Sequence, residues 1–498
     1  MTSTIDWHAR ARSLEPDARP FIGEARVELE GGDTFAEHHP HDGRLVARVP
    51  ECLPQPVDRA VDHARRAAQE GVWSARAPSQ RAAVLHDFAD RVAAHAQDLA
   101  LLDSLEMGIP ISLGVADLQE AAALAHATAS LAESVDSPVL PSAPTTLAMA
   151  CRVPHGVVAA ITPWNFPVYV ALSKVVPALA MGNSVVLKPS EVASLGCLRL
   201  ADLAREAGVP PGVFQVVTGR GATTGRALAL HPDVDCLSFT GSTATGQRLM
   251  GYAGESNLKA LLLECGGKSP QIVFDDMADP EELDALAGEL VHSFTWNAGQ
   301  LCVAGTRILV ARSLHEPLWQ RMAEHVRALS TGDPLDPHTT IGPLASRTQL
   351  ERVQAWVELA QRELLPMVRG QAWPGGCHLA PTLIREVPNG HRLMQEEIFG
   401  PVAGMVPFDD EAQALQLANQ SRYGLQATVW TRDIARAQRL SRRLQAGTVL
   451  VNAAASPAPG LVSGAGAEPV KMSGFGAEGG RAGLLAYTRL RNVQFNLG

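Results

Sequence analysis

The segment Gly299–Arg307 holds a single thiol, Cys302, between two glycines. A thiolate is a nucleophile that can attack a carbonyl carbon and carry an acyl group through a covalent intermediate. A free cysteine is nevertheless more often a small buried apolar residue, and the segment on its own favours that interpretation. Cys302 is therefore a candidate nucleophile that needs chemical partners elsewhere in the chain.

Glu264 and Asn165 could supply two of these partners. Glu264 ends an apolar run and precedes two glycines. In an apolar pocket the pKa of its carboxyl would rise, which suits it to take a proton from water. Asn165 lies between Pro163 and Pro167, and an amide held rigidly there could donate to a developing oxyanion. Each motif alone is equally compatible with an ordinary role, a salt-bridged acid for Glu264 and a structural asparagine for Asn165.

Two glycine-containing turns could line a dinucleotide. Phe239–Gly246 joins a predicted strand to a helix, and its small residues leave backbone N–H groups free for a pyrophosphate. It does not match the G-x-G-x-x-G fingerprint, and a tight packing turn is the alternative. Gly219–Gly225 has a G-x-G with the wrong third spacing, so we interpret it as lining the adenine side at most.

Carboxylates at two further turns could hold ribose hydroxyls. Lys188 and Glu191 follow a predicted strand, as the acid of a dinucleotide-binding fold does. The alternative is a helix start with Ser190 as its cap. Glu397 lies in a loop with a neighbouring acid, and it could hold the nicotinamide ribose.

The order of apolar segments indicates how these motifs are positioned. Predicted strands near 156–161, 184–188, 213–217, 234–239 and 259–264 alternate with helices, and a second such run continues to 451. This alternation is typical of a parallel sheet covered on both faces, which binds ligands beyond the carboxyl ends of its strands. Residues 56–135 are predicted to be helical, and Pro189–Glu191 is predicted to open a helix that runs to Gly208. The expected fold class is α/β.

Composition excludes several classes of function. The 498 residues are 46% hydrophobic and 19% charged with a net charge of −10, so we expect a globular enzyme of two or three domains that binds neither nucleic acid nor membranes. We find no signal peptide, no bilayer-spanning run and no zinc-spaced ligands, and expect no metal. Seven scattered cysteines without a C-x-x-C pair indicate a reducing, cytoplasmic location.

Taken together and in this order, the motifs resemble those of the aldehyde dehydrogenase superfamily from about residue 20 to the C-terminus. The blocks that carry the resemblance are Ile161–Pro167, Leu187–Glu191, Phe239–Gly246, Leu263–Pro270, Gly299–Arg307, Glu396–Val402, Asn419 with Tyr423–Leu425, and Lys471–Gly474. Leu335–Pro337 and Tyr252–Asn257 look most like the branch that oxidises aminoaldehydes and γ-glutamylaminobutyraldehyde.

The resemblance implies a role for each matching residue. Cys302 matches the nucleophile, Asn165 the oxyanion amide and Glu264 the base that hydrolyses a thioester, while Lys174 and Glu478 match a proton relay. NAD is the implied cofactor, and Glu191 should repel the 2′-phosphate of NADP. The residues implied to bind NAD are Ile161, Thr162, Trp164, Lys188, Ser190, Glu191, Gly221, Gly225, Phe239, Thr240, Gly241, Ser242, Gly246, Glu397 and Phe399.

The same resemblance implies a Rossmann-like NAD-binding domain over 8–132 and 153–264, a catalytic domain over 265–470, and a small oligomerisation arm over 133–152 and 484–498. A homodimer or homotetramer is expected. The stretch 453–470 lacks the family's Phe-Gly-Gly and has no acid before Glu468, which favours a neutral or bulkier aldehyde over a cationic aminoaldehyde. Three alternatives stay open: a CoA-acylating dehydrogenase, a cysteine hydrolase, and a non-catalytic NAD-binding homologue with a blocked pocket.

Overall fold

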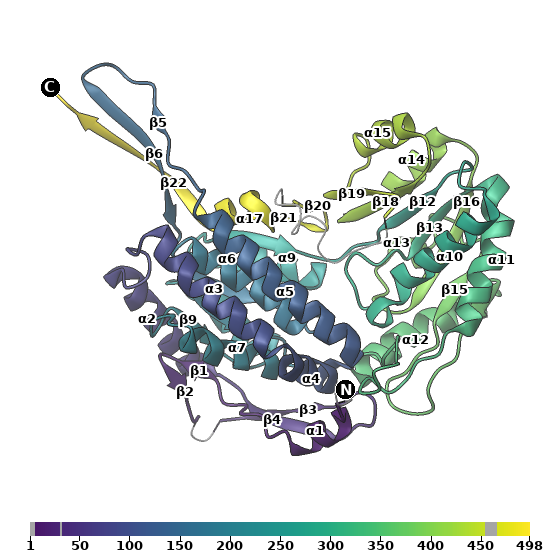
Figure 1. Cartoon of the computed structure of the whole chain (residues 1–498), viewed down its shortest axis with the longest axis horizontal. Coiled ribbons are helices and arrows are strands. Elements are labelled where there is room, and N and C mark those ends of the chain that lie inside the picture. Colours follow the sequence, from purple (N-terminus) through teal and green to yellow (C-terminus); the bar gives the residue numbers. More distant parts are fainter. Residues whose placement is uncertain (1–4, 30–31, 454–465) are drawn as a thin grey trace.

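The computed structural model describes residues 5–29, 32–453 and 466–498. The chain forms two α/β units, each built on its own sheet, and a long antiparallel arm that projects from the first unit and carries the C-terminus (Figure 1). The predicted α/β fold is confirmed.

The first unit is built on an eight-stranded sheet of order β2-β1-β9-β8-β7-β10-β11-β21. Its five central strands, which are β9, β8, β7, β10 and β11 in sheet order, run parallel. Their carboxyl ends carry the predicted motifs, because β7 ends at Ile161, β8 at Lys188 and β11 at Glu264. The strands are β1 Phe21–Ile22, β2 Ala25–Arg26, β7 Val157–Ile161, β8 Ser184–Lys188, β9 Phe214–Val216, β10 Cys236–Thr240, β11 Ala260–Glu264 and β21 Gly474–Phe475.

Helices cover both faces of this sheet, as continuous apolar strands require. One buried cluster joins the sheet to α3, α4, α5, α6 and α7, and another joins it to α2, α8 and α9. The helices are α2 Pro54–Glu70, α3 Pro78–Ala94, α4 Ala96–Met107, α5 Ile111–Ala132, α6 Pro167–Ala180, α7 Leu195–Glu206, α8 Arg226–Leu230 and α9 Thr243–Glu255. The N-terminal region adds α1 Trp7–Ser13 and the hairpin β3 Thr34–His38 with β4 Leu45–Pro50.

The predicted start of the helix after β8 is wrong, because α7 begins at Leu195 rather than at Pro189. The physical reason is a distant acid. The Glu106 carboxylate on α4 accepts from the backbone N–H groups of Ser194 and Leu195 at 2.6 and 2.7 Å. This remote cap fixes the first turn of α7. Residues 189–194 are therefore a turn, which carries Glu191 at the sheet edge.

The second unit has a seven-stranded sheet of order β14-β15-β16-β13-β12-β18-β19, parallel except for the β14–β15 pair. Its strands are β12 Pro270–Val273, β13 Arg307–Ala311, β14 Met367–Arg369, β15 Thr382–Ile384, β16 Val402–Phe408, β18 Gln426–Trp430 and β19 Thr448–Val451. Its helices are α10 Pro280–Thr295, α11 Arg312–Ala328, α12 Arg347–Arg362, α13 Arg392–Gln395, α14 Glu411–Asn419 and α15 Ile434–Ser441.

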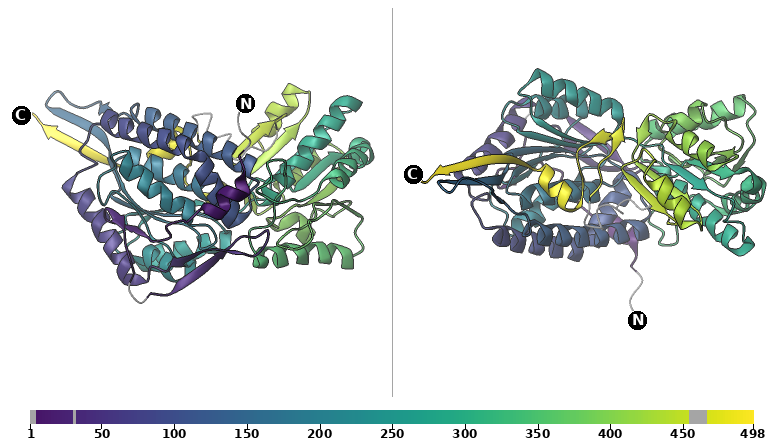
Figure 2. Two further views of the ribbon diagram at one scale, coloured as in Figure 1. Left: turned by 60° about the horizontal axis from the view of Figure 1, so that its bottom comes forward. Right: turned by 90° about the horizontal axis from the view of Figure 1, so that it is seen from above.

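The C-terminal region connects the two units and then forms the arm. β20 Val470–Lys471 pairs with β17 Tyr423–Gly424 of the second unit, and β21 pairs with β11 of the first. After α17 Gly480–Ala486, β22 Thr488–Asn496 pairs along its whole length with β6 Thr146–Pro154, which also pairs with β5 Val139–Leu140. Both further views show these strands extending beyond the body of the molecule (Figure 2). No helix among the described residues is long and apolar enough to cross a membrane.

Candidate active site

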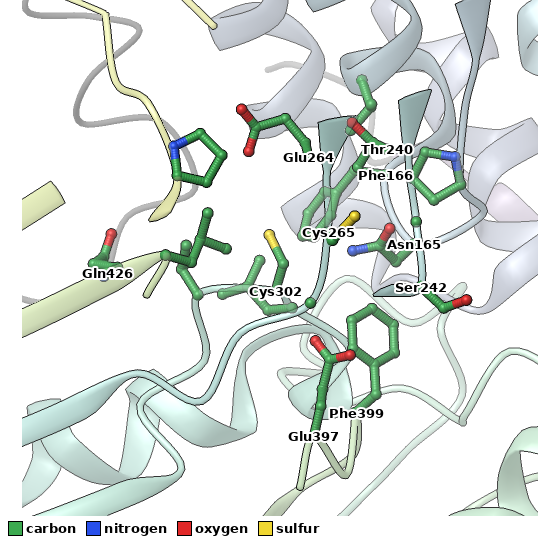
Figure 3. Close-up of a pocket in the computed structure, with 18 of the residues that line it drawn as sticks. Asn165, Phe166, Thr240, Ser242, Glu264, Cys265, Cys302, Glu397, Phe399 and Gln426 are labelled. Atoms are coloured by element: carbon green, nitrogen blue, oxygen red, sulfur yellow. The ribbon is translucent and has the colours of Figure 1, made fainter. Parts of the chain in front are cut away.

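A cavity of about 250 Å³ is lined by residues of both units, including those at the carboxyl ends of β10 and β11. Its wall includes ten of the residues singled out from the sequence, and Figure 3 labels Cys302, Glu264, Asn165 and Glu397 among them. The ten residues are Trp164, Asn165, Thr240, Gly241, Ser242, Glu264, Cys302, Glu397, Phe399 and Glu478. Residues that are more than 300 positions apart in the chain thus share one space.

Cys302 reaches this cavity from the irregular segment between α10 and β13. The 3₁₀ turn η2 Trp296–Gly299 contains left-handed residues at Asn297 and Ala298, with φ of 48° and 53°. Burial raises the pKa of the Cys302 thiol to about 12, and the nearby carboxyls of Glu397 and Glu264 add to this effect. The thiol is consequently protonated at neutral pH in this arrangement, and it must lose its proton before it can act as a nucleophile.

The amide of Asn165 is fixed against the same segment. It follows β7 in a turn that leads into α6, and its Nδ2 donates to the backbone oxygen of Gln300 at 2.9 Å. In return, Nδ2 of Asn297 donates to the backbone oxygen of Asn165 at 2.9 Å. The two loops are thereby locked together, which holds the Asn165 amide beside Cys302 in the cavity wall.

Glu264 is the last residue of β11, and the two glycines after it permit close approach of two other segments. A Cβ on Gly266 would lie 2.3 Å from Oε2 of Glu397, and a Cβ on Gly267 would lie 2.3 Å from the backbone oxygen of Cys302. Burial raises the pKa of Glu264 well above its usual value, and the negative charge of Glu478 raises it further. A carboxyl with a raised pKa is suited to general acid–base chemistry near neutral pH.

Ser473 holds this strand end in place, a role that the sequence analysis did not predict. Its hydroxyl donates to the backbone oxygen of Gly266 at 2.7 Å and accepts from the backbone N–H of Gly424 at 2.9 Å. Its own carbonyl accepts from the N–H of Cys265 at 2.8 Å. Ser473 therefore joins the Glu264 strand end to the second unit.

Lys174 and Glu478, the predicted relay, lie side by side. Lys174 is on α6 and only 2% exposed, and its Nζ lies 3.4 Å from Oε1 of Glu478. Glu478 lines the cavity, whereas Lys174 lies behind it. The hydroxyl of Ser173 contacts the same Glu478 oxygen at 2.9 Å, a contact that the sequence did not predict.

The predicted ribose pair lies at the end of β8, away from the thiol. Lys188 is buried, and its Nζ donates to the backbone oxygen of Pro189 at 2.8 Å and lies 3.4 Å from Oε2 of Glu191. Burial lowers the pKa of Lys188, and the Glu191 carboxylate opposes this effect. Gly225, in the π-helical turn η1 Gly221–Gly225, packs near the Lys188 side chain.

The loop that holds Glu397 is tied to α12. Oε1 of Glu397 accepts from the backbone N–H of Gly267 at 3.0 Å. Phe399 has a positive φ of 61°, and Nε2 of Gln349 donates to its backbone oxygen at 2.6 Å. The ring of Phe399 meets Trp164 edge-on, with centroids 5.4 Å apart. Gln349 also lines the cavity, and the sequence pattern did not single it out.

The residues at the carboxyl ends of the strands offer polar groups and open space that fit a bound dinucleotide. The hydroxyl oxygens of Thr162 and Thr240 are buried at the ends of β7 and β10, without a hydrogen-bond partner in the described part of the chain. Ser242 is the N-cap of α9, and it lines the cavity together with Gly241, so the N-terminus of this helix lies at the cavity wall. A Cβ on Gly221 would meet no atom within 4 Å, so this turn has open space before it.

The other predicted cofactor residues, Ile161, Thr162, Lys188, Ser190, Glu191, Gly221, Gly225, Phe239 and Gly246, lie outside the cavity wall itself. Within the described ranges, no group of three or more His, Cys, Asp and Glu side chains could hold a metal ion. Of the atypical stretch 453–470, residues 454–465 lie outside the described residues; Ala467 and Pro469 line the cavity.

Comparison with known proteins gives consistent matches over nearly the whole chain. The model of the aldehyde dehydrogenase family matches residues 27–493. Aminoacetaldehyde dehydrogenase from Pseudomonas aeruginosa is 41% identical over 453 residues, 91% of this chain and of that protein. NADP/NAD-dependent aldehyde dehydrogenase PuuC from Escherichia coli is 41% identical over 449 residues, 90% of each. A crystal structure of an indole-3-acetaldehyde dehydrogenase in complex with NAD+ has a TM-score of 0.95 and 40% identity, covering 99% of both chains.

Proposed function

This chain belongs to the aldehyde dehydrogenase family, and we propose that it oxidises an aldehyde to the carboxylic acid through covalent intermediates on Cys302. It is an NAD-dependent oxidoreductase that acts on aldehydes. The observation that carries the proposed mechanism is the meeting, in one cavity, of the Cys302 thiol, the Asn165 amide and the Glu264 carboxyl. A two-step acyl-enzyme oxidation needs all three.

In the first step the Cys302 thiol loses its proton to solvent, and its sulfur attacks the aldehyde carbonyl and forms a thiohemiacetal. The Asn165 amide and the backbone N–H of Cys302 donate to the oxygen that becomes negative. The contact of Asn165 with Gln300 supports this role, because it fixes the amide before the substrate arrives. Bound NAD supplies the hydride acceptor for the oxidation that converts the thiohemiacetal into a thioester.

In the second step Glu264 removes a proton from a water molecule that attacks the thioester. The carboxylic acid leaves, and the sulfur takes back from solvent the proton it lost in the first step, so the net change consumes one water and releases one proton, the one that Glu264 has taken up. The raised pKa of Glu264 supports this role. Glu478 and Lys174 then carry the proton away, which their contact and their place beside the cavity support.

We assign the adenosine ribose to Lys188 and Glu191, the pyrophosphate to the N-terminus of α9 at Ser242, and the nicotinamide ribose to Glu397. The remaining candidates from the sequence line the path between these points. The carboxylate of Glu191 repels a 2′-phosphate by charge, which supports a preference for NAD over NADP.

The three-part division and the location are also proposals. Residues 8–132 and 153–264 form the NAD-binding domain, and 265–470 the catalytic domain. The residues 133–152 and 484–498 form an oligomerisation arm of a homodimer or homotetramer, which the exposed apolar residues Val139, Leu490 and Phe495 support. All seven cysteines are free, which supports a cytoplasmic location.

The substrate is either an aminoaldehyde, as the name of the Pseudomonas aeruginosa relative suggests, or a neutral aliphatic or aromatic aldehyde, as the indole-3-acetaldehyde relative suggests. The lack of an acid before Glu468 in 453–470 favours the neutral class.

An NADH-coupled screen with aminoacetaldehyde, aliphatic aldehydes and aromatic aldehydes tests the function, with the product identified in the presence and absence of CoA. The proposal requires NADH and free acid in both cases. Acyl-CoA as the main product would indicate the CoA-acylating alternative. Failure to bind NAD would indicate a cysteine hydrolase, and NAD binding without turnover of any aldehyde would indicate a non-catalytic homologue.

A further inference from the structure

Two consecutive residues of α6 converge on one oxygen of Glu478. The Ser173 hydroxyl lies 2.9 Å from Oε1, and Nζ of Lys174 lies 3.4 Å from the same atom. The hydroxyl contact is the shorter of the two, and Ser173 is only 8% exposed. A hydrogen bond from a buried hydroxyl to a carboxylate is stronger than one between neutral groups.

The backbone of Glu478 is held independently of this contact. Its N–H donates to the backbone oxygen of Ala467 and its oxygen accepts from the N–H of Ala467, both at 2.9 Å. The position of the Glu478 Cα is therefore set by the pairing with Ala467. The direction of its side chain depends on the partners of the carboxylate, which are Ser173 and Lys174.

The Ser173 hydroxyl has two acceptors within reach. It lies 3.0 Å from the backbone oxygen of Val170 and 2.9 Å from Glu478, and it has one hydrogen to donate. When Glu478 is ionised, Ser173 can donate to its carboxylate. When Glu478 has taken up a proton, its O–H can donate to Ser173 Oγ, whose own hydrogen then turns to Val170. The buried hydroxyl of Ser173 therefore has a hydrogen-bond partner in both protonation states of Glu478.

We propose that Ser173 is a positioning residue that orients Glu478 and keeps it able to accept and release a proton during hydrolysis of the Cys302 thioester. This inference rests on the proposed function, because it gives Ser173 a role in only the second of the two proposed steps, the hydrolysis of the thioester. The location of Ser173 agrees with the assignment, because it lines both the catalytic cavity and a small void between α5, α6 and α17. Ser173 thus lies between the catalytic cavity and this void.

Among the described residues, the titratable groups near Glu478 include Glu264, Lys174, Cys302, Tyr169 and Tyr487. Both tyrosines have pKa values that burial raises above their usual range, so they stay neutral and do not exchange protons with Glu478 near pH 7. Because the Cys302 sulfur carries the acyl group during hydrolysis, we assign Glu264 and Lys174 as the groups that exchange a proton with Glu478 in the second step.

The test compares Ser173→Ala, Ser173→Thr and Thr128→Ala in single turnovers with enzyme in excess. NADH formation reports the first step, and quenched acid release reports the second. We expect Ser173→Ala to slow acid release about 10-fold while NADH formation changes less than about twofold. Ser173→Thr should restore acid release, because it keeps the hydroxyl and the void can receive the added methyl group. Thr128→Ala, which alters the same void from α5, should match the unchanged protein.

A double-mutant cycle with Glu478→Gln separates positioning from a general packing defect. If Ser173 acts through Glu478, adding Ser173→Ala to Glu478→Gln changes acid release little further. Equal slowing of both steps, unchanged acid release, additive effects in the cycle or no recovery with threonine would each overturn the inference. If the unchanged protein itself forms no NADH with any aldehyde, the proposed function fails instead.

Discussion

The side-chain amide of Asn165 donates to the backbone oxygen of Gln300, two residues before Cys302, at 2.9 Å. The reciprocal bond from Asn297 to the Asn165 carbonyl closes a small network between the β7–α6 turn and the segment that carries the thiol. The candidate oxyanion donor and the candidate nucleophile are thus parts of one rigid unit. An electrostatic donor that is fixed before the reaction costs no reorganisation when charge develops.

Replacing Asn165 by alanine should therefore lower kcat about 10²- to 10³-fold. The change removes a donor to the developing oxyanion while Cys302 and Glu264 remain. Steady-state kinetics with the best aldehyde of the screen measure the effect, and Asn257→Ala is the control, because that exposed amide bonds to the backbone of residues 232 and 234 and to the Ser256 hydroxyl, and does not line the cavity. A decrease in kcat of less than about threefold would contradict the role assigned to Asn165.

Alkylation of Cys302 without cofactor should be slow at neutral pH and should accelerate with rising pH. The thiol pKa of about 12 lies above its usual value, so the thiolate fraction grows about tenfold per pH unit below that pKa. Iodoacetamide labelling from pH 6.5 to 9.5, followed at the Cys302 peptide by mass spectrometry, measures this dependence. A rate that is already maximal at pH 6.5 would show that the thiol is ionised in the free enzyme.

Glu191→Ser should shift cofactor preference toward NADP. The substitution removes the negative charge that would face a 2′-phosphate and leaves the Lys188 side chain in place nearby. We expect the ratio of kcat/KM for NADP to that for NAD to rise about 10-fold or more, which corresponds to about 1.4 kcal/mol. Glu206→Ser, on the far end of α7, is the matched control. An unchanged ratio would remove Glu191 from the ribose site.

Asp117→Asn should stabilise the protein at pH 8 but not at pH 4. Asp117 is buried on α5, its Oδ2 has no partner in the described ranges, and burial, with a further contribution from Glu120, raises its pKa to about 8. Below pH 4 the folded and unfolded states both hold the proton. Between pH 4 and 8 the unfolded state releases it more readily, so the native state loses stability as pH rises.

Asparagine does not titrate, so the substitution removes this loss of stability. We expect the free energy of unfolding at pH 8 to rise by about 1–3 kcal/mol. Thermal or denaturant unfolding at pH 4, 6 and 8 gives the comparison, with Asp62→Asn, at an exposed position on α2, as control. The same gain at all three pH values would mean that ionisation of Asp117 is not the cause.

The sheets and the approximate positions of the motifs could be predicted because buried parallel strands are continuous apolar runs. Val157–Ile161 and Ser184–Lys188 are buried along their whole length, and such runs are recognisable without tertiary information. Strand ends then place Glu264 and Lys188 at one edge of the sheet. The nucleophile, amide and base could be named for this reason and through the family resemblance.

What the sequence did not predict depends on contacts between distant segments. The start of α7 is set by Glu106, 88 residues before Ser194, so local capping signals at Ser190 were misleading. Ser473 and Gln349 act through backbone atoms of remote loops, and no periodicity or composition marks such a bond. Ser173 differs from an ordinary helical serine only because Glu478 folds against it, 305 positions later.

The measurement that tests the central claim most directly is a single experiment on Glu264→Gln. Mixed with NAD and a substrate aldehyde, this variant should form about one NADH per active site and then stop, because the thioester on Cys302 is no longer hydrolysed. Intact mass analysis should show one acyl group, mapped to Cys302. Sustained turnover at the rate of the unchanged protein, or an NADH burst without an acyl group on Cys302, would contradict the proposed mechanism.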